Sequence, residues 1–273
     1  MHPEFQPTAG RSILRRMPLL AALLIAISSA LLLTGCGNGT STANQTLVRS
    51  IIAYVPAPGA DGSLTLIGNN TFLTGGNVGF GQVANGGGYI SITSGPFSAT
   101  ASGPTVTTPI ALNGQTLSGN NTAYTLIAVG EAGQTGTFVP QLLLIPNFAG
   151  SPAIPTGDAA IRVVNVSLNP NNIGLYATSS GAPSAVLTAG LNSIPYGYSA
   201  ATNAYVYIPT AQLTNMALVD VTNTHTALSL SSASNLNTST FTPGQAYTLY
   251  IIGQPGNSAE PLTALWVVDF PSS

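Results

Sequence analysis

Few side chains in this sequence could perform nucleophilic chemistry. Ser199 lies in the segment GYSAA, residues 197–201, which is one residue short of the Gly-x-Ser-x-Gly elbow of serine hydrolases. A nucleophilic serine needs a base beside it, and His225 is the histidine that could serve. However, no strand–turn–helix pattern surrounds GYSAA, and the segment TNTHTAL around His225 is typical of a strand end or hairpin. The sequence therefore predicts a structural histidine and no catalytic residue.

Acid–base and metal chemistry are poorly supported as well. The chain has seven acidic residues, two histidines and one cysteine. The acids are scattered and give no pair at a spacing that suggests glycosidic acid–base chemistry. A zinc site would lack ligands, and no EF-hand spacing is present for calcium. The sequence predicts neither a metal site nor a cofactor.

Two arginines are the chief candidates for a polar site. Arg49 and Arg162 are the only cations after residue 16, since lysine is absent, and they lie in similar segments. One interpretation is a structural ion pair at each arginine, with Glu131 and Glu260 as the partners. The other interpretation is contact with an anionic ligand. We favour the structural interpretation.

Four tyrosines form a candidate ligand-binding cluster. Tyr196, Tyr198, Tyr205 and Tyr207 lie within twelve residues of one another. In an extended strand Tyr205 and Tyr207 share a face, so their rings could stack on a sugar. The alternative is that these rings belong to a sandwich core and to cross-strand pairs, which is the favoured interpretation.

The amino-terminal segment has the layout of a signal peptide. Arg11, Arg15 and Arg16 precede the apolar run MPLLAALLIAISSALLL, residues 17–33. A basic stretch followed by an apolar run and small residues is typical of export signals. The run is shorter than the roughly 20 residues of a usual membrane-spanning helix. We therefore predict export rather than a permanent membrane span.

The single cysteine suggests the fate of that segment. Leu33-Thr34-Gly35-Cys36 resembles the lipobox of bacterial lipoproteins. The resemblance implies removal of residues 1–35 and acylation of Cys36, which would anchor the chain to the bacterial cell envelope. Several acyl chains on one residue give stable anchoring. Residues 36–45 then form a flexible tether. Gly37 follows the cysteine where some family members carry an aspartate, which favours the outer membrane if the organism has one.

The composition is unusual for a globular protein. Charged residues make up 4% of the chain, against about 25% in ordinary proteins. A nucleic-acid-binding protein needs many basic residues, so nucleic acid is excluded as a partner. The hydrophobic share of 44% is too high for a disordered chain. A packed fold with a surface of amides and hydroxyls is expected.

The chain contains a tandem repeat. AYTLIAVGEAG, from Ala123, resembles AYTLYIIGQPG, from Ala246, so that Tyr124 matches Tyr247 and Gly130 matches Gly253. Farther upstream, the segments around Arg49 and Arg162 also match. We predict repeats at residues 46–149 and 158–273, joined by a linker at residues 150–157.

Each repeat is predicted to be an antiparallel β-sandwich. Short apolar and β-branched segments alternate with turn residues, and no helical periodicity follows the signal segment. About seven strands are expected in the second repeat. The expected ranges are 160–167, 173–178, 185–187, 204–208, 216–220, 226–230 together with 246–252, and 262–270. The fold class is therefore all-β, with two sandwiches in tandem.

Several short motifs resemble one bacterial family. RVVNVS from Arg162, the Asn-Pro turn at 169–170, IGLY, PGQAYTLYIIG and EPLTALWVVDF are similar to domain of unknown function 4397. That resemblance implies an immunoglobulin-like sandwich, often found in tandem in exported and lipid-anchored proteins. It implies no chemistry, because the family has no established activity.

Three functional hypotheses follow. The favoured one is a non-enzymatic, lipid-anchored envelope protein with a structural or adhesive role towards a protein or a glycan. The second is a glycan-binding module that uses the tyrosine cluster. An envelope hydrolase is the disfavoured third.

Overall fold

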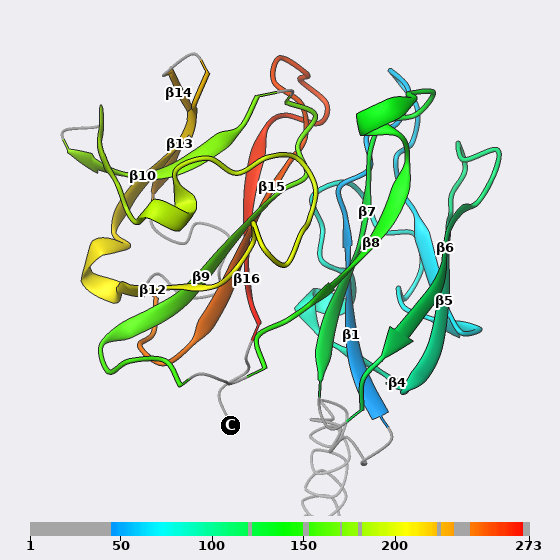
Figure 1. The fold of residues 1–273 in the computed structure, drawn as a ribbon. Helices are drawn as coiled ribbons and strands as arrows, with labels where there is room; N and C mark the ends of the chain where they lie inside the picture. The colour runs from blue at the N-terminus through cyan, green and yellow to red at the C-terminus, as the bar shows by residue number, and fades with distance from the viewer. Residues whose placement is uncertain are drawn as a thin grey trace, which may run out of the picture. The chain divides into compact units, whose positions relative to one another are not determined.

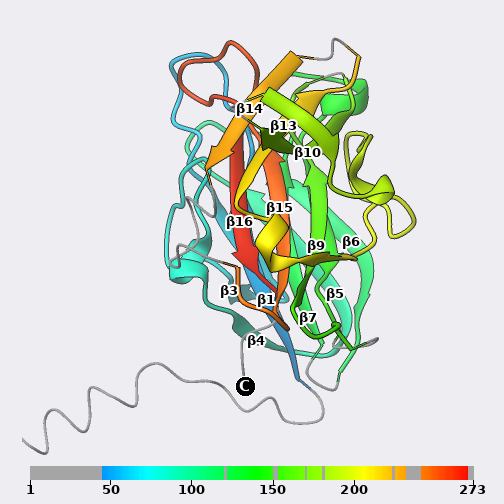
Figure 2. The same cartoon turned by 90° about the vertical axis from the view of Figure 1, so that its left-hand side faces the viewer.

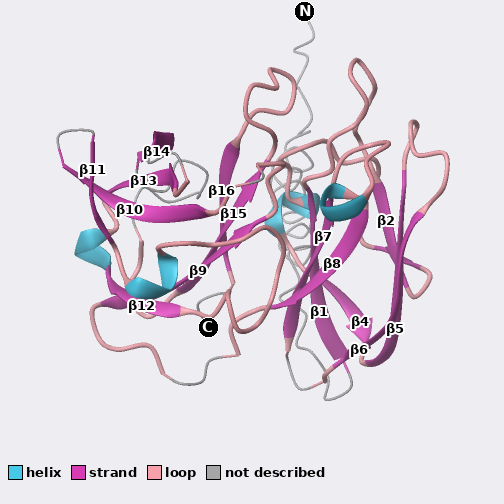
Figure 3. Ribbon diagram, turned by 45° about the horizontal axis from the view of Figure 1, so that its top comes forward, coloured by secondary structure: helices cyan, strands magenta, loops and turns pink. Residues whose placement is uncertain are grey.

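A computed structural model describes residues 45–119, 122–149, 153–169, 171–179, 182–222, 225–231 and 241–269. The predicted signal peptide, Cys36 and all of the predicted tether except Gln45 lie outside these ranges. Strands dominate the described residues, and the helical segments among them are short 3₁₀ turns (Figure 3). The all-β prediction is therefore confirmed. No helix in this part of the chain has the length and hydrophobicity that a membrane crossing requires.

Within the described residues, each half of the chain contributes eight strands. Those of the first half are β1 (Gln45–Ile52), β2 (Thr65–Gly68), β3 (Thr71–Phe72), β4 (Ile90–Thr93), β5 (Gly95–Ser102), β6 (Ile110–Leu117), β7 (Ala123–Val129) and β8 (Gln141–Pro146). Those of the second half are β9 (Asp158–Asn165), β10 (Ile173–Ser179), β11 (Ala182–Val186), β12 (Val206–Pro209), β13 (Asn215–Asp220), β14 (His225–Ser231), β15 (Ala246–Ile252) and β16 (Thr263–Val268). The 3₁₀ turns are η1 (Ala84–Gly87), η2 (Gly136–Phe138), η3 (Ala189–Leu191) and η4 (Thr210–Gln212).

The strand order of the first half recurs in the second. The first half forms sheets with the orders β4-β1-β7-β8 and β3-β2-β5-β6. The second half forms β12-β9-β15-β16 and β11-β10-β13-β14, which is the same order with eight added to each number. In both halves the first strand pairs in parallel with the seventh, and the other pairings are antiparallel. The fold therefore repeats along with the sequence.

The second half differs from the sequence prediction in several strand bounds and, more importantly, in the assignment of two strands. We expected about seven strands and placed residues 226–230 and 246–252 in one of them. The structure separates them into β14, which pairs with β13, and β15, which pairs with β9 and β16. They thus belong to opposite sheets of the second sandwich. The immunoglobulin-like assignment stays a prediction.

The three largest hydrophobic cores of the described residues lie between the four sheets. One fills the first sandwich, between β2 and β5 on one side and β1 and β7 on the other. The second core fills the second sandwich, where β10 and β13 pack over β9, β15 and β16 (Figure 2). The third lies between the two central sheets, where β1, β7 and β8 pack against β9, β15 and β16 (Figure 1). Residues 41–273 accordingly form one compact unit.

Successive side chains of the central strands pack alternately into two of these cores. In β1, Val48 and Ile52 belong to the core of the first sandwich, and Ile51 belongs to the shared core. In β9, Val163 and Val164 are divided in the same way. Successive side chains of a strand point to opposite faces, and here both faces are covered. This explains why β7 and β15 are almost continuous apolar runs.

Candidate functional site

The two arginines occupy equivalent positions in the central sheets. Arg49 of β1 is in register with Thr125 of the parallel strand β7, and Arg162 of β9 is in register with Thr248 of β15. Their exposed fractions are 2% and 1%. Each arginine donates to the threonine beside it, from Arg49 Nη2 to Thr125 Oγ1 over 3.0 Å and from Arg162 Nε to Thr248 Oγ1 over 2.9 Å. The repeat thus places two guanidinium groups at the interface between the sandwiches.

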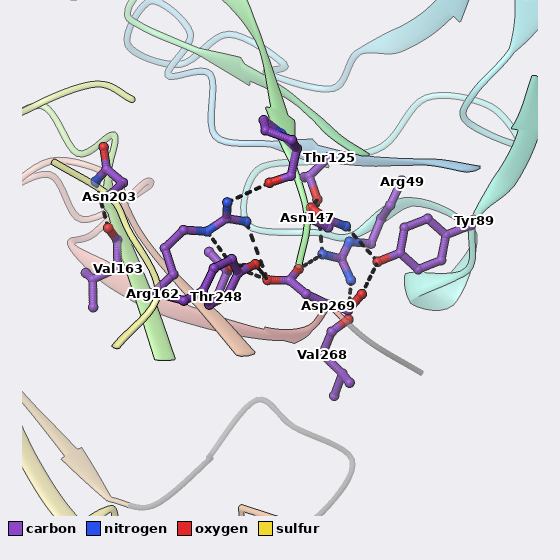
Figure 4. A network of polar contacts seen from close by, with 12 residues as sticks. Arg49, Tyr89, Thr125, Asn147, Arg162, Val163, Asn203, Thr248, Val268 and Asp269 are labelled. Atoms are coloured by element: carbon purple, nitrogen blue, oxygen red, sulfur yellow. Dashed lines mark hydrogen bonds and ion pairs between the residues drawn. The ribbon is translucent and has the colours of Figure 1, made fainter. Parts of the chain in front are cut away.

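One carboxylate serves both arginines. Asp269, which directly follows β16, is 1% exposed and lies between the two guanidinium groups (Figure 4). Its Oδ1 accepts from Arg49 Nη2 over 2.7 Å, and its Oδ2 lies 3.4 Å from Arg162 Nη2. Thr248 also donates to Oδ2, as does the Tyr205 hydroxyl over 2.5 Å. Asp269 therefore joins side chains from both repeats.

The backbone contacts of the arginines are reciprocal. Arg49 Nη1 donates to the carbonyl oxygen of Val268, in the last strand of the second repeat, over 2.7 Å. Arg162 Nη1 donates to that of Pro146, in the last strand of the first repeat, over 2.6 Å. Each arginine thus crosses to the other repeat, with the geometry of a two-fold interface. We call Arg49, Thr125, Asn147, Arg162, Thr248 and Asp269 the arginine clamp.

The clamp is symmetric in position but not in charge. Asn147 directly follows β8, as Asp269 directly follows β16. Asn147 Oδ1 accepts from Thr125 over 2.9 Å, and its Nδ2 donates to the Tyr89 hydroxyl over 2.8 Å. Two guanidinium groups therefore share a single carboxylate, which leaves the clamp with a net positive charge. The two arginines also differ, because Arg49 Nε is buried without a hydrogen-bond partner among the described residues, whereas Arg162 Nε donates to Thr248.

Aromatic rings surround the guanidinium groups. Arg49 lies 5.0 Å from the ring centre of Tyr89, and Arg162 lies 4.5 Å from that of Tyr205 and 5.8 Å from that of Tyr198. These distances are typical of cation–π contacts.

Burial fixes the protonation states of these groups. It raises the pKa of Tyr89 to about 12, against the counteracting effect of Arg49. Burial also raises the pKa of Tyr205, and the nearby charge of Asp269 raises it further. Burial alone would lower the pKa of both arginines, but Tyr89 and Asp269 outweigh it at Arg49 and chiefly Asp269 does so at Arg162. At neutral pH the rings are therefore uncharged and the arginines are cations.

A surface depression of about 380 Å³ opens beside Arg162. Its lining residues are Pro146, Asn147, Phe148, Ala149, Arg162, Tyr198, Ala200, Asn203, Ala204, Tyr205 and Tyr207. The volume lies within the usual range for small-molecule sites. We call it the tyrosine depression. A second depression, of about 570 Å³, lies between residues 56–60 and 254–260 and has Glu260 as its charged lining residue.

The tyrosine cluster is divided by the fold. Tyr198, Tyr205 and Tyr207 line the depression, and Tyr205 meets Phe148 edge to face with ring centres 5.1 Å apart. Tyr196 instead packs against the shared core, with its ring 5.0 Å from that of Phe138. All four side chains are half-buried. The structure thus groups three of the four tyrosines with Arg162.

The expected partners of the arginines were wrong. Both arginines pair with Asp269 and not with Glu131 or Glu260. Glu131 follows Gly130 at the end of β7, and its equivalent in the second repeat is Gln254 rather than Glu260, which precedes β16. The arginines lie in mid-strand, in register with Thr125 and Thr248 near the beginning of β7 and β15, whereas Glu131 and Gln254 follow the ends of these strands. Aligning IPNF, residues 145–148, with VVDF, residues 267–270, shows that Asn147 and Asp269 are at equivalent positions.

The disfavoured catalytic pair lies on separate elements. Ser199 is in an exposed turn before β12, where its backbone N–H donates to Asn203 Oδ1 over 2.8 Å. His225 begins β14 in the outer sheet, and its side chain lies outside the described residues. Within the described ranges, no group of three or more His, Cys, Asp or Glu side chains is placed to hold a metal ion.

Comparison with known proteins leaves the family open. The chain matches no protein family model and no curated protein. Among solved structures, it is similar to one from Bacteroides uniformis that is provisionally described as a cell adhesion protein. The sequence identity is 12% and the TM-score is 0.25, over 86% of this chain and 100% of that chain. A match at this level carries no argument about fold or function.

Proposed function

We propose that this chain is an exported, lipid-anchored envelope protein with a non-enzymatic binding or adhesive role. The observation that carries the proposal is the commitment of charged side chains to internal structure. Arg49, Arg162 and Asp269 are buried in the clamp that joins the repeats. The two repeats then act as one rigid unit that presents a weakly charged surface, held at the membrane by Cys36.

The anchor is tested by mass spectrometry of the exported chain. We expect an amino-terminal peptide that begins at Cys36 and carries acyl groups. A Cys36→Ser variant should lose the acyl groups and leave the membrane fraction. An exported chain with an unmodified residue 36 would contradict the proposal.

The adhesive role needs a separate test. Cells that lack the protein should attach less well to their usual surface or to each other, and the intact gene should restore attachment. The Cys36→Ser variant should fail to restore it, because the binding unit would no longer be held at the cell. Unchanged attachment in cells without the protein would contradict an adhesive role.

Glycan binding is a second candidate, favoured by one observation. Tyr198, Tyr205 and Tyr207 line one depression of suitable volume, and aromatic rings are good partners for the apolar faces of sugars. A glycan array with the intact protein tests this candidate. Tyr198→Ala should lose any signal, whereas Tyr176→Ala, a control in β10 of the outer sheet, should keep it. Equal loss in both variants, or no bound glycan, would contradict it.

A further inference from the structure

The charge of the clamp bears directly on the tyrosine depression. Arg162 and Asn147 both line the depression, and both belong to the clamp. Arg162 is so deeply buried that water screens its charge poorly, and interactions with a buried charge are stronger than those in bulk water. Asp269 is shared with Arg49 and neutralises only one of the two guanidinium groups. The depression therefore lies beside an uncompensated positive charge.

The lining residues add shape and neutral polarity to that charge. Tyr198 and Tyr205 flank Arg162, and Tyr207 and Phe148 extend the aromatic wall. Asn203 is held in place, because its Nδ2 donates to the carbonyl oxygen of Val163 over 2.8 Å. Aromatic walls suit a pyranose ring, and the positive charge suits an acidic substituent on it.

We propose that the tyrosine depression binds sugars that carry a carboxylate, the uronic acids, in preference to neutral sugars of the same shape. This inference rests on the glycan-binding candidate above and names its ligand class. The preference originates at Asn147, since an aspartate at that position, as at Asp269 in the second repeat, would cancel the charge that attracts the ligand.

Isothermal titration of the intact, detergent-solubilised protein with galacturonic acid and with its methyl ester tests the proposal. The two sugars share a ring and differ in charge. We expect the acid to bind with a Kd about tenfold lower than that of the ester. Asn147→Asp should raise the Kd of the acid by about tenfold, so that the acid and the ester bind about equally well. Asn113→Asp, which adds the same charge at an exposed position in β6, should change neither Kd.

The outcomes separate this inference from the proposals beneath it. Equal affinity for the acid and the ester would overturn the charge preference and leave glycan binding standing. Binding of neither sugar would overturn the preference and count against the tyrosine depression as a glycan site. The comparison of acid with ester needs no variant, so it stays decisive even if Asn147→Asp fails to fold. The lipid anchor at Cys36 is tested independently of these sugar-binding results.

Discussion

The buried carboxylate of Asp269 takes part in ion pairs and in hydrogen bonds with neutral side chains. It compensates two arginines from different repeats, and it accepts hydrogen bonds from Thr248 and Tyr205. Removing one partner of a buried ion pair leaves the other charge unpaired in a poorly solvated site. The residue is therefore more sensitive to substitution than any exposed acid of the chain should be.

We expect Asp269→Asn to lower the free energy of unfolding by about 3–5 kcal/mol. The buried tryptophan Trp266, the only one in the chain, reports unfolding in urea by its fluorescence. The matched control is Asp61→Asn, an exposed acid that accepts from the backbone N–H of Ser63. The control should leave the urea midpoint almost unchanged, because surface substitutions of this kind have little effect on stability. Similar losses in both variants would show that the clamp does not depend on its carboxylate.

Asn147→Asp should have the opposite effect. A carboxylate at this position would accept from Thr125 and Tyr89 and balance the second guanidinium, so we expect a gain of about 1 kcal/mol at pH 7. The folded state would depress the pKa of this carboxylate below its ordinary value, so the gain should vanish as the pH falls below about 4. Urea titrations at pH 7 and pH 3 measure this difference. A loss of stability at pH 7 would contradict the charge asymmetry.

The contacts of Tyr89 with Arg49 and Asn147 of the clamp predict sensitivity to alkali. Burial raises the pKa of Tyr89 to about 12 in the folded chain, whereas an unfolded tyrosine ionises near about 10. A group whose folded pKa is raised contributes stability below its unfolded pKa, and that contribution is lost as the pH rises through the folded pKa. Thermal unfolding followed between pH 7 and pH 12 should show a Tm that falls above about pH 10. Tyr89→Phe should reduce that fall, and an equal fall in both proteins would contradict this account.

The sequence identifies the two arginines of the clamp but not the carboxylate that they share. Arg49 and Arg162 stand out because they are the only cations in the repeats and the repeat aligns them. Asp269 lies 220 residues from Arg49, and nothing local marks it as a partner. By composition, Glu131 and Glu260 were equally plausible as partners of the arginines. They are excluded only by the strand pairing, which places Asp269 and neither glutamate beside the arginines. Long-range side-chain pairing requires the stacking of the central sheets, which a single sequence does not reveal.

At the scale of elements, glycines control the hairpins that follow β7 and β15. Gly130 and Gly253 have φ values of +93° and +84°, a region that disfavours other residues. A Cβ at Gly253 would also meet the carbonyl oxygen of Pro261, and one at Gly130 would meet that of Val139. The match between these glycines in the sequence thus has a steric cause.

Gly253→Ala should lower the free energy of unfolding by about 3 kcal/mol or more, from strain and from the backbone clash together. Gly256→Ala is a matched control, because its φ of +80° is similar but a Cβ there would meet nothing within 4 Å. We expect the control to lose about 1 kcal/mol, from backbone strain alone. Chemical unfolding of both variants measures the difference, and equal losses would contradict the role of the Pro261 contact.

Strands with clear alternation or long apolar runs were predictable. The observed bounds of β10, β13 and β15 lie within one residue of those expected from the sequence. No ranges were predicted for the strands of the first half, which include the two-residue strand β3. Strand ranges were also easier to predict than sheet membership, which failed for β14 and β15. Which sheet a strand joins depends on pairings distant in the chain.

At the scale of the whole molecule, the two repeats share a hydrophobic core. The Pro- and Gly-containing segment between them in the sequence does not predict this core. The shared core contains large buried apolar side chains such as Ile51, Val164 and Ile252, and burying each such side chain contributes about 1.5–3 kcal/mol. The clamp adds polar contacts across the same surface. Two domains joined only by a linker would unfold separately, whereas these repeats should unfold together.

Differential scanning calorimetry of the intact protein tests this central claim most directly. We predict a single heat-absorption peak, with a calorimetric enthalpy about equal to the van't Hoff enthalpy. Asp269→Asn should move that single peak to lower temperature without splitting it. Two separate peaks in the unmodified protein, one for each sandwich, would contradict the account.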